Sequence, residues 1–175
     1  MSSIIKVNTF QDANGNALFS SDGSGNVTLS SGDFKSTPAF LVRNGGTGQS
    51  LSDDTKTKVT AFDSADYDTD SAWNASTSLF TVPSGKGGKY FIYGALKYSG
   101  SSSRRITIFV TKNGSDLIKC ANNVSYYSGV NLALVADLSA SDYLELYCKI
   151  DQGGGGTIGG DSNEEFFGAY RIIGA

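Results

Sequence analysis

The chain has 175 residues, enough for one domain with a proper core and a modest appendage. Its formal net charge of −3 gives no basic footprint for nucleic acid, and the absence of histidine excludes the usual Ser-His-Asp and Cys-His catalytic arrangements within this chain. No apolar run approaches the ~20 residues of a membrane helix, and the N-terminus lacks a signal-peptide core. We therefore expect a chain without enzymatic activity, cofactor, nucleic-acid partner or membrane insertion.

Residues 1–35 are rich in Asn, Gly and Ser, and the dipeptides Asn14-Gly15 and Asp22-Gly23 are typical of turns. Short strands are expected at 4–10, 17–19 and 27–29. So few residues lie between turns that the segment cannot bury a core of its own. Large apolar side chains are unfavourable in a linker that is surrounded by water. We therefore interpret the segment as an extended, β-rich attachment segment that orders against neighbouring chains. The apolar side chains concerned are Ile4, Ile5, Val7, Phe10 and Phe19.

From residue 36 to residue 175 the pattern becomes that of a globular domain. The residues 79–82 and 89–98, either side of a Pro-Ser-Gly break, predict a central hairpin, and Asn113-Gly114 predicts a second one. No helical periodicity separates the strands, which excludes a parallel βαβ architecture. We predict an all-β, antiparallel, two-sheet jelly-roll sandwich. Its strands are expected at 37–43, 56–62, 79–82, 89–98, 105–112, 116–121, 129–138, 143–150 and 164–173.

A long acidic loop is expected before residue 79. Closely spaced carboxylates could bind Ca²⁺, and the candidates are Asp63, Asp66, Asp68 and Asp70. The loop lacks the glycine and the closing glutamate of an EF-hand, so a solvated charged loop is the favoured interpretation and no metal site is predicted.

Three further features have a structural and a functional interpretation. The glycine-rich residues 153–160 are expected to form a loop, because no helix follows to complete a phosphate cradle. Trp73 and the pair Tyr126-Tyr127 lie in loop contexts, where they could make contacts at the tip of the domain or be partly buried. Cys120 and Cys148 lie in apolar runs and are expected to be reduced and buried.

Four segments in order resemble the jelly-roll domain of the C1q/TNF family. They are FTVPSGKGGKYFIYGALKYS (80–99), FVTKNGSDL (109–117), LALVADLSASDYLELYCKI (132–150) and EEFFGAYRI (164–172). The chain departs from the family pattern at Ser141-Asp142, where Gly-Asp is usual, and at Ala169, where Phe is common.

The resemblance implies a homotrimer packed through an aromatic inner sheet made of the first, central, sixth and last strands. Carried onto this chain, the interface or core candidates are Phe40, Tyr90, Phe91, Tyr93, Leu132, Leu134, Phe166, Phe167 and Tyr170. Because neighbouring residues of a strand face opposite sides, only some of them can line the threefold axis. The resemblance also places Cys120 and Cys148 on either side of the strand 105–112, too far apart for a disulfide.

The opening IIKVNTFQDANGNALFSSDGSG is similar to the openings of structural proteins of tailed bacteriophages, especially marine ones. This similarity implies a virion structural protein, made in the host cytoplasm and located in the virion. A capsid decoration protein bound to the major capsid protein is the leading hypothesis, and a short tail fibre bound to tail components and a host surface receptor is the alternative. A free trimeric module that binds carbohydrate or protein is a third hypothesis.

Overall fold

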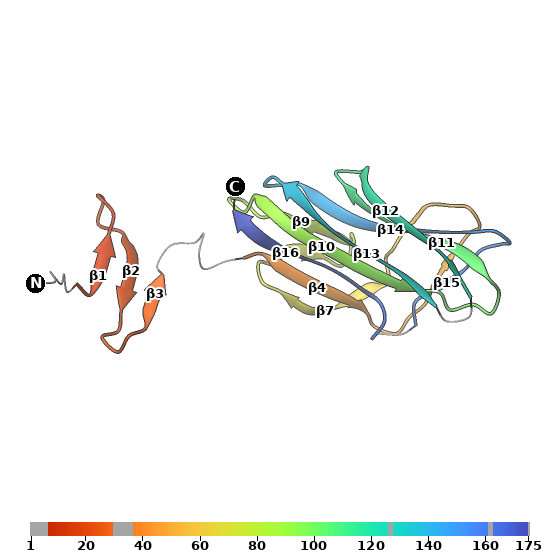
Figure 1. The fold of residues 1–175 in the computed structure, drawn as a ribbon, viewed down its shortest axis with the longest axis horizontal. Coiled ribbons are helices and arrows are strands. Elements are labelled where there is room, and N and C mark those ends of the chain that lie inside the picture. The colour runs from red at the N-terminus through yellow and green to blue at the C-terminus, as the bar shows by residue number, and fades with distance from the viewer. Residues whose placement is uncertain (1–6, 30–36, 126–127, 161–162, 175) are drawn as a thin grey trace, which may run out of the picture. The chain divides into compact units, whose positions relative to one another are not determined.

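The structure is a computed structural model that describes residues 7–29, 37–125, 128–160 and 163–174. The chain divides into two compact units, Met1–Thr37 and Pro38–Ala175. The regular structure of the described residues consists of β strands, labelled in Figure 1. None of these residues forms a helix of the length and apolarity that a bilayer crossing requires.

The N-terminal unit is an antiparallel three-stranded sheet in the order β1-β2-β3, formed by β1 (Thr9–Gln11), β2 (Ala17–Ser21) and β3 (Val27–Leu29). In each of its two turns an Asp carboxylate accepts hydrogen bonds from backbone N–H groups of the turn. The Oδ1 atom of Asp12 accepts hydrogen bonds from the backbone N–H groups of Asn14 and Asn16, each at 2.9 Å. Hydrogen bonds from Asn16 lower the pKa of Asp12, and those from Asn26 and Ser24 lower that of Asp22. Each carboxylate thus holds its turn in place.

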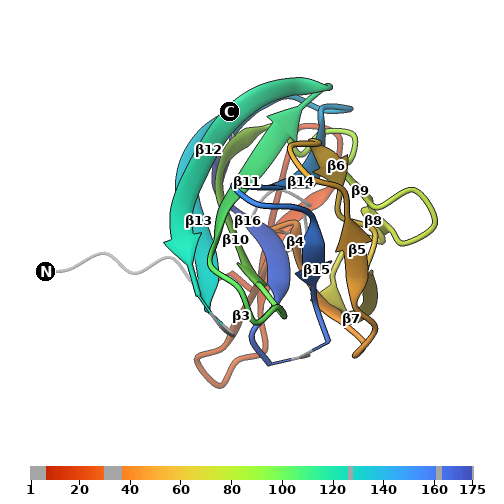
Figure 2. The same ribbon diagram turned by 90° about the vertical axis from the view of Figure 1, so that its right-hand side faces the viewer.

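The second unit consists of two larger antiparallel sheets and one small one. The five-stranded sheet has the order β13 (Gly129–Leu138), β10 (Gly88–Lys97), β16 (Phe166–Gly174), β4 (Ala39–Asn44) and β7 (Phe62–Asp68). The six-stranded sheet has the order β12 (Ser115–Val124), β11 (Arg104–Lys112), β14 (Tyr143–Asp151), β9 (Leu79–Thr81) and β8 (Trp73–Asn74), and β6 (Thr57–Lys58) also pairs with β14. At one end of the unit β15 (Gly156–Ile158) pairs with β5 (Gln49–Leu51), as Figure 2 shows.

The core lies between the two larger sheets and follows from the alternation of side chains along each strand. Phe40 of β4 and Phe80 of β9 stack with their ring centroids 4.5 Å apart, and Phe167 of β16 meets Phe40 edge-on at 5.2 Å. All three are fully buried. On β11 the core side chains are Ile106, Ile108 and Val110, each fully buried. The predicted all-β jelly-roll sandwich is therefore confirmed. The inner sheet that the resemblance implied is also confirmed, because β4, β10, β13 and β16 lie in one sheet, and β7 is added at its edge.

The two predicted hairpins have different outcomes. The β11–β12 hairpin is confirmed: Asn113 and Gly114 both have positive φ, at 53° and 78°, as a two-residue type I′ turn requires. The predicted hairpin between 79–82 and 89–98 is wrong, because β9 pairs with β14 in one sheet and β10 pairs with β13 and β16 in the other. The Pro-Ser-Gly segment therefore carries the chain from one sheet to the opposite sheet.

The expected acidic loop is wrong in its first half. Residues 62–68 form β7, which pairs with β4 at the edge of the five-stranded sheet. The strand expected at 56–62 is divided in the structure: Thr57 and Lys58 pair with β14, whereas Phe62 begins β7 and pairs with Asn44 of β4. The glycine-rich loop includes β15, and a Cβ at Gly155, the residue before this strand, would lie 2.2 Å from the carbonyl oxygen of Leu51. Glycine there allows a close backbone approach.

The turn between β13 and β14 provides a test of backbone strain. Ser141 has a φ of 71°, a left-handed conformation that costs a residue with a side chain about 1–2 kcal/mol, and its backbone N–H donates to the carbonyl of Val82 at 2.9 Å. Replacement Ser141→Gly removes this strain at an entropic cost of about 0.5–1 kcal/mol. We expect it to raise the free energy of unfolding by about 0.5–1 kcal/mol in urea denaturation.

The matched control is Ser139→Gly in the same turn, where φ is not positive. Only the entropic cost applies there, so a small loss of stability is expected. A loss of stability in Ser141→Gly as large as that in the control would contradict the interpretation.

Candidate interaction surface

The central strand β10 has apolar side chains on both of its faces. Tyr90 and Ile92 point into the sandwich and are fully buried, whereas Phe91 and Tyr93 point outward and are half-buried. A strand that is apolar on both faces is typical of a sheet covered on both sides. In this chain the six-stranded sheet covers the inner side.

The outward side of the five-stranded sheet carries a continuous group of aromatic rings. The ring centroids of Phe91 and Tyr170 lie 5.4 Å apart, those of Phe91 and Tyr93 5.7 Å, and those of Tyr93 and Phe166 5.9 Å. We call this surface the aromatic face and define it by Tyr67, Phe91, Tyr93, Val135, Phe166 and Tyr170. Val135 is 54% exposed, and Tyr67 and Tyr170 are each 42% exposed.

Tyr93 occupies the middle of the aromatic face because the neighbouring strand makes room for it. Gly168 lies directly opposite Tyr93 on β16, and a Cβ at Gly168 would lie 2.6 Å from the Tyr93 ring. The hydroxyls of Tyr93 and Tyr67 are 3.2 Å apart, so a hydrogen bond joins them. Burial raises the pKa of the Tyr93 phenol, and the hydrogen bond with Tyr67 raises it further. The phenol is therefore neutral at physiological pH.

Ion pairs flank the aromatic face. Lys89 Nζ lies 2.7 Å from an Asp137 carboxylate oxygen, joining β10 to β13, and Arg43 Nε lies 2.5 Å from one of Asp66, joining β4 to β7. An apolar centre with a polar rim is the usual anatomy of a protein–protein interface.

The structure separates the predicted interface or core candidates into two groups. Phe40, Tyr90, Leu132 and Phe167 are buried in the core, and Leu134 packs against it. The four candidates that point outward are Phe91, Tyr93, Phe166 and Tyr170. Tyr67 and Val135 complete the aromatic face and were missed from the sequence. Tyr67 lies in the segment interpreted as a loop, although Val135 could have been found from its alternation with Leu134.

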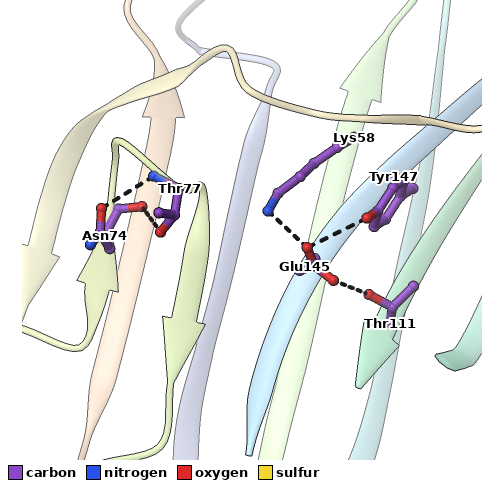
Figure 3. A network of polar contacts seen from close by, with 6 residues as sticks. All are labelled: Lys58, Asn74, Thr77, Thr111, Glu145 and Tyr147. Carbon is purple, nitrogen blue, oxygen red and sulfur yellow. Dashed lines mark hydrogen bonds and ion pairs between the residues drawn. The ribbon is translucent and has the colours of Figure 1, made fainter. Parts of the chain in front are cut away.

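The outer side of the six-stranded sheet is polar by comparison. The Glu145 carboxylate, only 8% exposed, accepts hydrogen bonds from Lys58 Nζ at 2.8 Å, Thr111 Oγ1 at 3.2 Å and the Tyr147 hydroxyl at 3.4 Å (Figure 3). Lys56 Nζ lies over the Phe109 and Tyr147 rings, 5.0 and 4.8 Å from their centroids. The two sheets therefore present surfaces of different chemistry.

The N-terminal sheet has its largest apolar side chains on one face. Phe10 and Phe19 are paired across β1 and β2, and their rings stack with centroids 4.4 Å apart. Phe10 remains 45% exposed, and Val27 is 62% exposed. The opposite face carries the paired residues Thr9, Ser20 and Thr28 together with Leu18, which is 43% exposed. Of the other attachment candidates, Val7 is 43% exposed, and Ile4 and Ile5 lie outside the described residues.

The four carboxylates of the acidic segment have separate partners. Asp63 accepts a hydrogen bond from the Gly45 N–H at 2.6 Å, Asp66 binds Arg43, Asp68 accepts from the N–H groups of Ala72 and Trp73, and Asp70 accepts from Thr69 Oγ1 at 2.8 Å. Among the described residues no group of three or more His, Cys, Asp or Glu side chains is arranged to hold a metal ion. These contacts give the carboxylates structural roles.

The remaining candidates are placed as follows. The Trp73 ring stacks on Phe40 with centroids 5.5 Å apart, which puts it against the core, and Tyr126 and Tyr127 lie outside the described residues. Cys120 and Cys148 are both free, and both lie directly opposite Ile108, on β12 and β14. Burial raises the pKa of the Cys148 thiol, which keeps it protonated.

Comparison with solved structures agrees with the sandwich fold. No protein-family model and no curated protein sequence matches the chain. Among solved structures, it is similar to an Eiger TNF from S. frugiperda, with 17% identity and a TM-score of 0.59 over 79% of this chain and 94% of that chain. It is also similar to the globular domain of zebrafish complement 1qA protein, with 18% identity and a TM-score of 0.55 over 80% of this chain and 100% of that chain.

Murine APRIL at pH 5.0 gives 13% identity and a TM-score of 0.57 over 78% of this chain and 100% of that chain. The chain therefore has the jelly-roll fold of the TNF and C1q domains, as its four motifs predicted.

The buried phenol of Tyr90 gives a prediction about alkaline stability. Burial raises its pKa to about 12, and its hydroxyl donates to the carbonyl oxygen of Lys86 at 2.6 Å. In the unfolded chain the phenol ionises near 10, so its contribution to stability is complete below pH 10 and is lost as pH rises to about 12. We expect Tyr90→Phe to make the decline in unfolding free energy across this window shallower by about 1.4 kcal/mol per pH unit.

The measurement is urea denaturation at several pH values and a fixed protein concentration. Phe80→Leu, a core substitution without a titrating group, should lower stability without changing the slope. Equal slopes in wild type and Tyr90→Phe would contradict the assignment.

Proposed function

We propose that this chain is a non-enzymatic structural protein that assembles as a homotrimer through its aromatic face. The observation that carries the proposal is the outward side of β10, where Phe91 and Tyr93 continue an aromatic surface that the other described residues of the second unit leave uncovered. An exposed apolar surface with a polar rim marks an interaction site.

The occupant of the aromatic face is a second and a third copy of the same chain. The flanking charges favour self-association, because Lys89 and Arg43 are already paired with Asp137 and Asp66 and leave no single-signed patch that would repel an identical neighbour. The neutral phenol of Tyr93 can also enter an interface without an uncompensated charge. The motif resemblance to the C1q/TNF family supports a threefold arrangement.

The trimeric head belongs to a tailed-phage virion, with the N-terminal unit as its attachment segment. Two features support this role: the similarity of the opening sequence to phage structural proteins, and the exposed apolar face of the N-terminal sheet around Phe10 and Val27. A small sheet with one unburied apolar face gains stability when another protein covers it. A capsid decoration protein, held close to the major capsid protein, is the leading form of the proposal.

Two alternatives remain distinct from decoration. A short tail fibre would use the same trimer to contact a host receptor, with the N-terminal unit bound to tail components. A free trimeric module that binds carbohydrate or protein would need no virion partner at all. The location of the protein on purified particles separates these three proposals.

The trimer predicts a solution mass about three times the 18.3 kDa of one chain. Phe91→Lys and Tyr170→Lys each place a charge in the centre of the proposed interface, where burial without a partner is unfavourable. We expect either substitution to shift the mass measured by sedimentation equilibrium to that of one chain.

The matched control is Asn123→Lys, on the exposed outer edge of the six-stranded sheet, which should leave the mass unchanged. A wild-type protein that sediments as a single chain at micromolar concentration would overturn the trimer.

The virion role predicts that the protein is present on purified particles of a phage that encodes it. Deletion of its gene should lower the resistance of filled capsids to heat or chelator if the protein decorates the capsid. Impaired adsorption with normal capsid stability would support a tail fibre instead. Absence of the protein from purified particles would contradict both forms of the virion proposal.

A further inference from the structure

The outer side of the six-stranded sheet contains a cationic trough beside the polar network around Glu145. The trough is a hollow of about 400 Å³ lined by Arg105, Thr107, Phe109, Lys119, Ala121, Lys149 and Asp151. An adjoining hollow of about 340 Å³ shares Arg105 and Ala121 and adds Asn122, Asn123 and Gln152. Because Arg105 and Ala121 line both hollows, the two hollows form one continuous surface feature.

The register of three strands produces this trough. Thr107 of β11 lies between Ala121 of β12 and Lys149 of β14, and the next outward residue, Phe109, lies between Lys119 and Tyr147. Thr107 and Ala121 are short, whereas Arg105, Lys119 and Lys149 are long and rise on either side of them. The floor is therefore a small neutral surface, and the three cations around it outnumber the one carboxylate of the lining, Asp151.

Two of the cations have no acidic partner among the residues that the structure describes. Lys149 is neutralised by Asp54 at 2.6 Å and by Asp151 at 3.1 Å. Arg105 and Lys119 are exposed, and neither forms an ion pair with any described residue. Since the whole chain has a net charge of −3, two unpaired cations around one hollow are a local excess that favours an anionic ligand.

The other lining groups indicate the kind of anion. Thr107 and the side-chain amides of Asn123 and Gln152 offer hydroxyl and amide groups, which hydrogen-bond readily to sugar hydroxyls. The Phe109 ring is only 7% exposed, so the trough lacks the exposed stacking platform of a single-stranded nucleic-acid site.

We propose that this trough binds an acidic oligosaccharide, a sugar chain that bears carboxylate or sulfate groups. Arg105 and Lys119 bind the anionic groups, and the side-chain amides of Asn123 and Gln152 bind neighbouring hydroxyls. The site lies on the sheet opposite the aromatic face, so it does not depend on the proposed trimer and remains available when that face is covered.

The test is isothermal titration of the full-length protein with four probes: an oligogalacturonate, a sulfated dextran oligosaccharide, a neutral dextran oligosaccharide of the same length, and a single-stranded DNA oligonucleotide. We expect binding of at least one acidic sugar, no binding of neutral dextran, and a loss of affinity as salt is raised above ~0.15 M, because exposed charges are then screened. Arg105→Gln and Lys119→Gln should each weaken binding about tenfold, equivalent to ~1.4 kcal/mol.

Two control variants make the result specific. Lys119→Arg keeps the charge and should retain most of the affinity. Lys86→Gln removes a lysine between β9 and β10, outside both the trough and the aromatic face, and should leave binding unchanged. The proposal would be overturned by failure of both acidic sugars to bind, by equal binding of neutral dextran, by tighter binding of DNA, or by an equal loss in Lys86→Gln. Circular dichroism confirms that each variant is folded before it is titrated.

Discussion

The structure depends on one strand, β10, which carries large apolar side chains on both of its faces, so that both faces need to be covered. Its run of Tyr90, Phe91, Ile92 and Tyr93 places a large apolar side chain at every position, so neither side of the strand can face water without exposing aromatic surface. The six-stranded sheet covers Tyr90 and Ile92 and forms the core with them. The described residues of the second unit leave the other side, with Phe91 and Tyr93, uncovered, and we propose that copies of the chain cover it. The fold of this unit and the proposed assembly would then both follow from the same strand.

The two sheets differ in how their outer sides are made, and this difference orients the domain in an assembly. On β11 Ile106, Ile108 and Val110 face the core, whereas Arg105, Thr107, Phe109 and Thr111 lie on the outer side, where Lys56 Nζ covers the Phe109 ring. That side also carries the buried Glu145 network (Figure 3) and the cationic trough, which suit solvent and polar ligands. One sheet is thus suited to contact with copies of the chain, and the other to contact with the surroundings.

The sequence predicts features that depend on local chemistry, such as turns. It does not predict which strands pair when the pairing depends on distant segments of the chain. Asn113-Gly114 identifies its hairpin because both residues tolerate positive φ. The segment around Pro83 has equally clear turn chemistry, yet its flanking strands enter opposite sheets, a choice that depends on β14 and β16, which lie more than 60 residues later. The strand β7 was missed because Asp63, Asp66 and Asp68 have low strand propensity; at a sheet edge such charges are common, since they discourage further pairing. Dividing the candidate aromatic residues between the core and the outer surface required the observed direction of each side chain.

The central claim is that the aromatic face is covered by copies of the chain, and hydroxyl-radical footprinting of the unmodified protein tests it most directly. In a single chain Tyr170 is 42% exposed and Phe91 is half-buried beside it, so both rings would be oxidised. The account predicts that both are protected at micromolar concentration, that dilution restores their oxidation, and that the exposed side chains of the six-stranded sheet react equally at all concentrations. Oxidation of Tyr170 and Phe91 at a rate independent of concentration, and as high as their exposure in the single chain implies, would contradict it.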